Sequence, residues 1–153
     1  MSDPSNAEVF EQAQRLLENE DYGRSAIARL DEADSADDFA EAFYELWTEK
    51  NGASPAYGDD RQSLWELTLK HLRLRFCGAD DSLRTQIETY RKNAGSAPLL
   101  TGVVFYLVSA AGLPIDPMMA TVVILYILKF GLDVFCEYTE PQAEKTLPSS
   151  DSR

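Results

Sequence analysis

The segment from residue 98 to residue 136 constrains the fold more than any other part of the sequence. Of its 39 residues, 27 are apolar, against 44% in the whole chain. A stretch this apolar must be covered by other protein segments or by lipid. Gly112 and Pro114 interrupt it, and the pair Asp116-Pro117 is typical of an N-cap followed by the first residue of a new helix. The sequence therefore predicts two apolar helices joined as a tight antiparallel hairpin.

Helix length favours a protein core over a bilayer for this hairpin. The first helix, from Pro98 to Ala111, would have 14 residues and a length of about 21 Å, whereas a bilayer core of about 30 Å needs about 20 residues. The second helix carries Lys129 and Asp133, each costing about 2.5–3.5 kcal/mol near a bilayer centre. Their i, i+4 spacing predicts a buried ion pair. The alternative is a small membrane protein that inserts the 98–136 hairpin as an anchor or pore.

The rest of the sequence shows helical periodicity and none of the alternation that is typical of strands. Ser5 with Glu8, and Ser63 with Glu66, fit the capping box that opens many helices. We therefore predict an all-α fold of six to seven helices, with an acidic N-terminal helical unit and a bundle around the apolar hairpin. The predicted helices cover residues 6–19, 36–50, 63–77, 81–94, 98–111 and 117–138. A further helix, which carries Ala26, Ile27 and Leu30 on one side, follows a predicted turn at residues 21–23.

Acidic residues are concentrated in the first part of the chain. The chain holds 26 Asp and Glu against 14 Lys and Arg, and residues 1–62 hold 16 of those acids with only 5 bases. Such a surface repels phosphate backbones, so we expect no nucleic-acid partner; an acidic decoy that mimics nucleic acid is a further alternative. Residues 51–62 are rich in turn formers.

That turn-rich segment predicts a boundary between two parts of the chain. The first is an acidic three-helix unit over residues 1–62, which can also belong to one domain with the rest. The second is a helical bundle over residues 63–138. Residues 139–153 are polar and contain proline, so we predict a disordered tail.

The two cysteines, Cys77 and Cys136, lie far apart in the sequence. The first twelve residues are polar and acidic, without the basic and apolar regions of a secretory signal. We therefore expect a cytoplasmic protein with both thiols free. The alternative is membrane association from the cytoplasmic side.

No pattern in the sequence carries catalytic chemistry. It contains no glycine-rich phosphate loop, nucleophile elbow or zinc-protease motif. We interpret His71, the one histidine, as a partly buried structural residue rather than a base or a ligand. Two cysteines and one histidine are too few for a usual zinc site. The sequence predicts no catalytic residue, no cofactor and no metal, and hence no enzyme.

An aromatic stripe in the predicted helix 36–50 is the candidate contact surface. Tyr and Trp are favoured as interface anchors, and the same spacing also suits core packing. We predict binding of a protein partner, or self-association as a homo-oligomer, through Phe39, Phe43, Tyr44 and Trp47.

Two segments resemble known families. Residues 16–33 resemble the turn and second helix of a tetratricopeptide-type hairpin; they form a single copy, so an ordinary helical hairpin explains them. Residues 63–138 show a Leu-rich helix ending in Cys-Gly, a short amphipathic helix and an apolar hairpin with GLPIDP at its bend and GLDVFC near its end. This layout resembles small all-helical accessory domains of prokaryotic conflict and antiviral systems, which implies an accessory role within a larger assembly.

Overall fold

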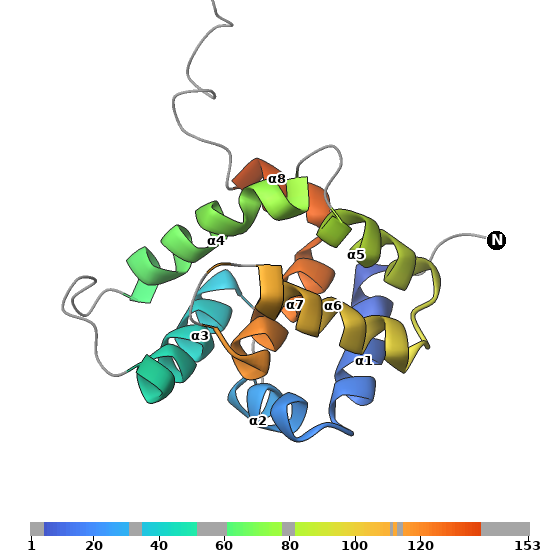
Figure 1. Ribbon diagram of the computed structural model, residues 1–153, viewed down its shortest axis with the longest axis horizontal. Helices are drawn as coiled ribbons and strands as arrows, with labels where there is room; N and C mark the ends of the chain where they lie inside the picture. Colours follow the sequence, from blue (N-terminus) through green and yellow to red (C-terminus); the bar gives the residue numbers. More distant parts are fainter. Residues whose placement is uncertain are drawn as a thin grey trace, which may run out of the picture.

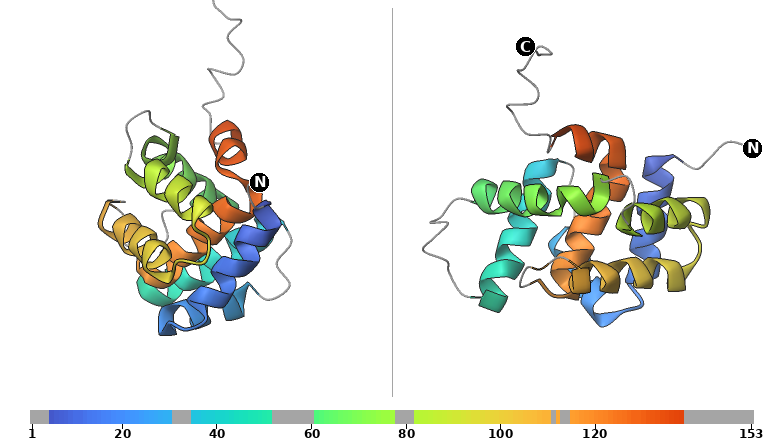
Figure 2. Two further views of the ribbon diagram at one scale, coloured as in Figure 1. Left: turned by 90° about the vertical axis from the view of Figure 1, so that its right-hand side faces the viewer. Right: turned by 45° about the horizontal axis from the view of Figure 1, so that its top comes forward.

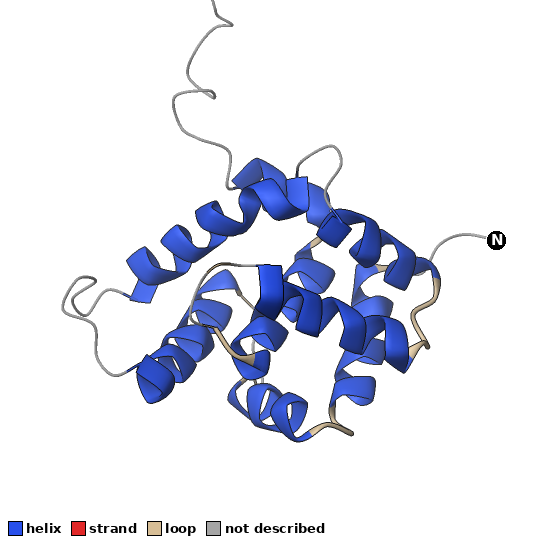
Figure 3. Cartoon of the chain, in the orientation of Figure 1, coloured by secondary structure: helices blue, strands red, loops and turns tan. Residues whose placement is uncertain are grey.

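The computed structural model of the protein describes residues 5–30, 35–51, 61–77, 82–110, 112 and 115–138. Within these ranges the chain forms eight α-helices and no strand (Figures 1 and 3). The all-α prediction is therefore confirmed. The helices are α1 (Asn6–Leu17), α2 (Asp21–Arg29), α3 (Ala36–Asn51), α4 (Arg61–Cys77), α5 (Ser82–Lys92), α6 (Ala97–Ala110), α7 (Pro117–Phe130) and α8 (Leu132–Tyr138).

Helix α7 is the centre of the molecule. Within this helix, the ten consecutive residues from Met119 to Leu128 are all buried. Helices α1, α2, α3 and α6 pack around it (Figures 1 and 2). It begins as predicted: Asp116 caps the helix by accepting a hydrogen bond from the backbone N–H of Met119 at 3.0 Å, and Pro117 follows as its first residue. Burial of so long an apolar run supplies much of the hydrophobic stabilisation of the fold.

The two apolar helices do not form the predicted antiparallel hairpin. Helix α6 runs across α7 instead of alongside it, and lies at the edge of the molecule in the left view of Figure 2. Six residues separate Ala110 from Pro117, and a connection of this length lets the chain change direction. The two helices consequently have different neighbours.

Gly131 divides the helix that the sequence predicted to continue to residue 138. Its φ of +96° lies in a region that side-chain-bearing residues rarely adopt, so α7 ends there and α8 begins at Leu132. A Cβ at this position would also lie 3.1 Å from the side-chain nitrogen of Asn6. Because of this break, the described residues form eight helices, one more than the six to seven predicted.

The start of the chain follows local sequence signals. Ser5 and Glu8 form the predicted capping box, with N–H···O distances of 3.1 and 2.9 Å. The chain then turns at residues 18–20, and not at the predicted residues 21–23, which belong to α2. Gly23 lets the first turn of α2 lie close to the end of α1, because a Cβ at this position would overlap the carbonyl oxygen of Leu17.

Aromatic rings connect helices from both halves of the chain. The ring of Trp65 on α4 packs edge-on against Tyr126 of α7, with centroids 5.2 Å apart, and lies 5.4 Å from Phe43 of α3. Phe76 and Phe135 form a similar pair between α4 and α8 at 5.5 Å. The predicted domain boundary falls mostly on residues 52–60, and the predicted disordered tail on residues 139–153; both lie outside the described residues.

The expectation of free thiols is wrong in this structure. Cys77, the last residue of α4, forms a disulfide with Cys136 of α8 across 59 positions of sequence, with Cα atoms 5.8 Å apart. Both residues are partly buried at the edge of the core. The fold brings the two helix ends together (Figure 1), which their spacing along the chain does not indicate.

Candidate functional site

The predicted aromatic contact surface belongs to the core. Phe39 and Phe43 are 0% exposed and Trp47 is 6% exposed, while Tyr44 is partly buried against the same core. Helix α3 turns this stripe towards α7 and α4, because rings of this size stabilise most when they are removed from water. The prediction of an exposed contact surface at these residues is therefore corrected.

Three other polar residues were singled out in the sequence: Lys129, Asp133 and His71. The ammonium of Lys129 lies 4.7 Å from the centre of the Phe10 ring, a cation–π contact. The side chain of Asp133 lies outside the described residues, so the ion pair stays a prediction. His71 is exposed and not partly buried, and its Nε2 lies 3.8 Å from where a Cβ on Gly112 would be.

The outward side of α6 is the most unusual surface of the described chain. On a helix with 100° per residue, six residues fall within an arc of about 120°, and all but the partly buried Tyr106 are exposed. The opposite side packs into the core. Residues 97–110 include no charged side chain. The outer face of α6 comprises Pro98, Leu99, Gly102, Phe105, Tyr106 and Ser109.

Two large apolar side chains are exposed on this face. Leu99 is 36% exposed and Phe105 is 45% exposed. Phe105 packs edge-on against Tyr22 of α2, with ring centroids 5.4 Å apart, so α2 extends the apolar surface sideways. Burial raises the pKa of Tyr22; the side chain of Thr101 opposes this rise, and the carboxylate of Glu20 adds to it. Glu20 is the N-cap residue of α2 and lies two positions before Tyr22.

Gly102 makes a notch in the middle of the outer face of α6. No heavy atom from elsewhere in the described chain lies within 4 Å of the position that a Cβ would take. Leu99 and Phe105 stand one turn on either side of it. Two other large apolar side chains, Leu67 on α4 and Val134 on α8, are exposed to 50% and 51%, each on a different helix. Single exposed residues of this kind are common on protein surfaces.

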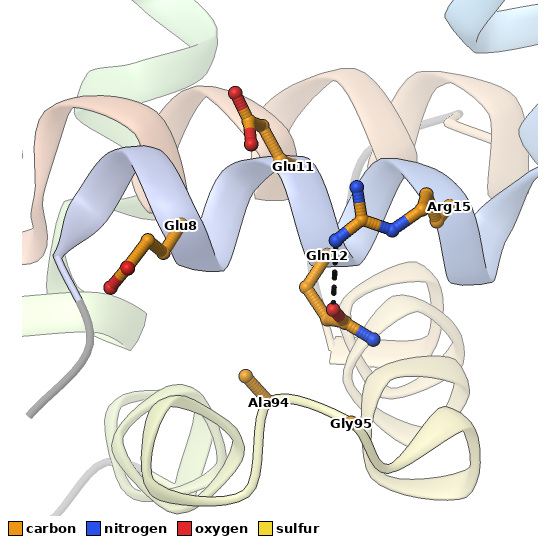
Figure 4. A pocket seen from close by; sticks show the side chains of 6 residues that line it. All are labelled: Glu8, Glu11, Gln12, Arg15, Ala94 and Gly95. Carbon is orange, nitrogen blue, oxygen red and sulfur yellow. Dashed lines mark hydrogen bonds between the residues drawn. The ribbon is translucent and has the colours of Figure 1, made fainter.

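A polar groove lies beyond the N-terminal end of α6, between α1 and the turn that follows α5 (Figure 4). Its volume is about 410 Å³. Within it Arg15 donates a hydrogen bond to Gln12 at 3.0 Å, and the carboxylate of Glu8 accepts one from the backbone of Ser5. The lining groups thus serve α1 itself, and they include neither a nucleophile nor a histidine. The lining residues are Glu8, Glu11, Gln12, Arg15, Ala94 and Gly95.

Comparisons with protein families, curated proteins and solved structures found no match to this chain. In the described part of the chain, each helix is too short or too polar to cross a membrane. The candidate site therefore rests on the geometry of α6 and its neighbours.

Proposed function

We propose that the protein is a non-catalytic protein–protein interaction module and that the outer face of α6 is its contact surface. One observation carries the proposal: a helix of 14 residues presents Leu99 and Phe105 to solvent with no charged side chain among its residues. Contiguous exposed apolar surface of this kind marks interaction sites in soluble proteins. Aromatic side chains such as Phe105 and Tyr106 are enriched in the cores of such interfaces.

A protein partner suits this surface better than a lipid bilayer does. The net charge of −12 opposes approach to anionic headgroups, and the helix beside Phe105, α2, begins with the acidic residues Glu20 and Asp21. In the membrane alternative, the 98–136 segment would insert, yet the run from Met119 to Leu128 lies inside the bundle. Co-flotation of the full chain with phosphatidylcholine–phosphatidylglycerol vesicles would support the membrane alternative and contradict our proposal.

We extend the proposal to the setting of the module, an accessory component of a prokaryotic defence or signalling system. This part rests on the layout of residues 63–138 alone. Deletion of the gene in its source organism should lower resistance to phage. Resistance that stays unchanged against a broad phage panel would remove this part of the proposal and leave the contact surface in place.

Site-specific photocrosslinking in cells tests the contact surface. A benzoylphenylalanine residue is introduced at position 99 or 105, or at the control positions 67 and 134, whose native side chains are at least as exposed. We expect covalent adducts with a protein from positions 99 and 105, and only background from the controls. Equal yields at all four positions, or no adduct from 99 and 105, would overturn the proposal.

A further inference from the structure

Helix α8 packs mainly on α4 and α7. It continues from α7 through Gly131. At the end of α4, Phe76 packs edge-on against Phe135, and the next residue of each helix, Cys77 and Cys136, forms the disulfide. The helix lies at the edge of the molecule beside α4 (Figure 1). One ring pair and one covalent bond, side by side, therefore hold α8 to α4.

The start of α8 has a groove beside it. This groove has a volume of about 360 Å³ and separates α8 from α1 and α5. Leu132 and Val134 line it from α8, whereas Asn6 lines it from α1 and Arg91 from α5. Val134 is 51% exposed, and neither α1 nor α5 is among the main neighbours of α8. Apart from its link to α7, the contact with α4 therefore carries most of the attachment.

Non-covalent packing alone holds α8 weakly. Of its described side chains, only Leu132 and Phe135 are buried. Ordering the backbone of its seven residues costs free energy at each one, and an isolated helix of this length is unstable in water. Burial of two apolar side chains contributes less free energy than this ordering costs. The crosslink to Cys77 therefore decides whether α8 stays docked.

We propose that the Cys77–Cys136 disulfide is a redox switch, and that its reduction releases α8 from the end of α4 while the core around α7 stays folded. This inference is independent of the contact surface on α6. Both cysteines are partly buried at the edge of the core and not inside it. A small dithiol can therefore reach the pair, and access is one of the factors that set the rate of disulfide exchange.

The reaction that opens the switch is thiol–disulfide exchange with a dithiol. One thiolate of the dithiol attacks a sulfur of the pair, which forms a mixed disulfide and releases the other cysteine as a thiolate. The second thiolate of the dithiol then attacks the first sulfur of the dithiol and releases the remaining cysteine. The dithiol loses two electrons and becomes a cyclic disulfide. Its two protons end on the sulfurs of Cys77 and Cys136.

The other described helices keep their packing when α8 leaves. The buried run from Met119 to Leu128 is covered by α1, α2, α3 and α6, and α4 also packs on α3 and α5. No described helix follows α8. Release of α8 therefore uncovers the ring of Phe76 and that of Tyr126, whose centroid lies 6.5 Å from that of Phe135.

Hydrogen–deuterium exchange of the full chain, with and without dithiothreitol, tests the switch. In the oxidised protein we expect protected amides from Phe135 to Tyr138. In the reduced protein these amides should exchange faster by roughly tenfold or more, towards the rate of an unfolded chain. The amides from Met119 to Leu128 should stay protected. Reoxidation should restore the protection of α8.

The double variant Cys77→Ser with Cys136→Ser is the matched control. It should show the exchange pattern of the reduced protein without reductant, and dithiothreitol should not change that pattern. The wild-type comparison stands without the variant. An α8 that stays protected after reduction would make the disulfide a passive crosslink and overturn the inference. Equal loss of protection in all helices, or free thiols in protein kept under oxidising conditions, would also overturn it.

Discussion

Helices α6 and α7 have the same length and nearly the same apolar character, yet the fold uses them in opposite ways. Each has 14 residues. In α7 ten consecutive residues are buried, whereas α6 buries one side and presents Leu99 and Phe105 to water. The difference comes from position. Helix α7 has helices on several sides, whereas α6 packs mainly on α5, α7 and α1 among the described helices, with the ring of Tyr22 on α2 at one edge. The apolar surface of α6 that remains exposed is therefore available to a partner.

Leucine-to-alanine substitutions on α7 and α6 should give the largest difference between the two helices. Leu125→Ala on α7 leaves a cavity at a fully buried position and should lower the free energy of unfolding by about 2–5 kcal/mol. Leu99→Ala on α6 should change it by about 0.5 kcal/mol or less, as surface substitutions do. Urea unfolding followed by circular dichroism measures both. Similar losses at the two positions would mean that α6 belongs to the core as much as α7 does.

The disulfide should stabilise the part of the molecule around α7. It joins α4 to α8, which continues from α7. Replacing both partners, Cys77→Ser with Cys136→Ser, removes a crosslink that spans 59 positions and should lower the free energy of unfolding by about 2–4 kcal/mol. Urea unfolding of the wild type with and without a reductant gives the same comparison without substitution. If the reductant has no effect on the wild type, the pairing does not form in solution.

High pH should destabilise the packing of α5, the helix that lies beside α6. The hydroxyl of Tyr90 on α5 donates a hydrogen bond to the carbonyl of Ala94 at 2.8 Å, and burial raises the pKa of Tyr90 to about 12, from 10. Tyr90 ionises more readily in the unfolded chain than in the folded one. The stability that its neutral, buried form contributes is therefore complete below pH 10 and is lost as the pH rises towards 12. The slope is at most about 1.4 kcal/mol per pH unit. Tyr90→Phe should flatten the stability profile in that window, and an unchanged profile would contradict the assignment.

The smallest effect is expected for Gly102→Ala, which is compared with the same substitution at a second helical glycine. Gly102→Ala adds a methyl group in open space and should stabilise the protein by about 0.5–1 kcal/mol, because alanine loses less backbone entropy in a helix. The same substitution at Gly23 should destabilise it, because the added methyl overlaps the backbone of Leu17. Thermal unfolding of both variants gives the two signs. A loss of stability in Gly102→Ala would show that the notch is filled in the folded protein.

Features with local causes could be predicted from the sequence. The capping box of Ser5 and Glu8 and the helix start at Asp116 and Pro117 depend on neighbouring residues alone, and both were predicted. The pairing of Cys77 with Cys136 depends on tertiary structure, to which spacing gives no guide.

Burial of each helix could not be predicted in the same way. Periodicity shows that Phe39 and Phe43 share a face, but it does not show whether that face meets the core or a partner. For α6 a signal was present, since Leu99, Gly102 and Phe105 follow one another at three-residue spacing in a helix without charge. The apolar sequence indicates that the helix must be covered on most sides, but it does not show which side remains exposed.

Photocrosslinking from position 105 against position 134 is the most direct measurement of whether α6 is a contact surface. Both native side chains are about half exposed, 45% and 51%, so exposure alone would give similar yields. We predict a discrete protein adduct from position 105 and none above background from position 134. Equal yields, or no adduct at either position in intact cells, would contradict a contact surface on α6.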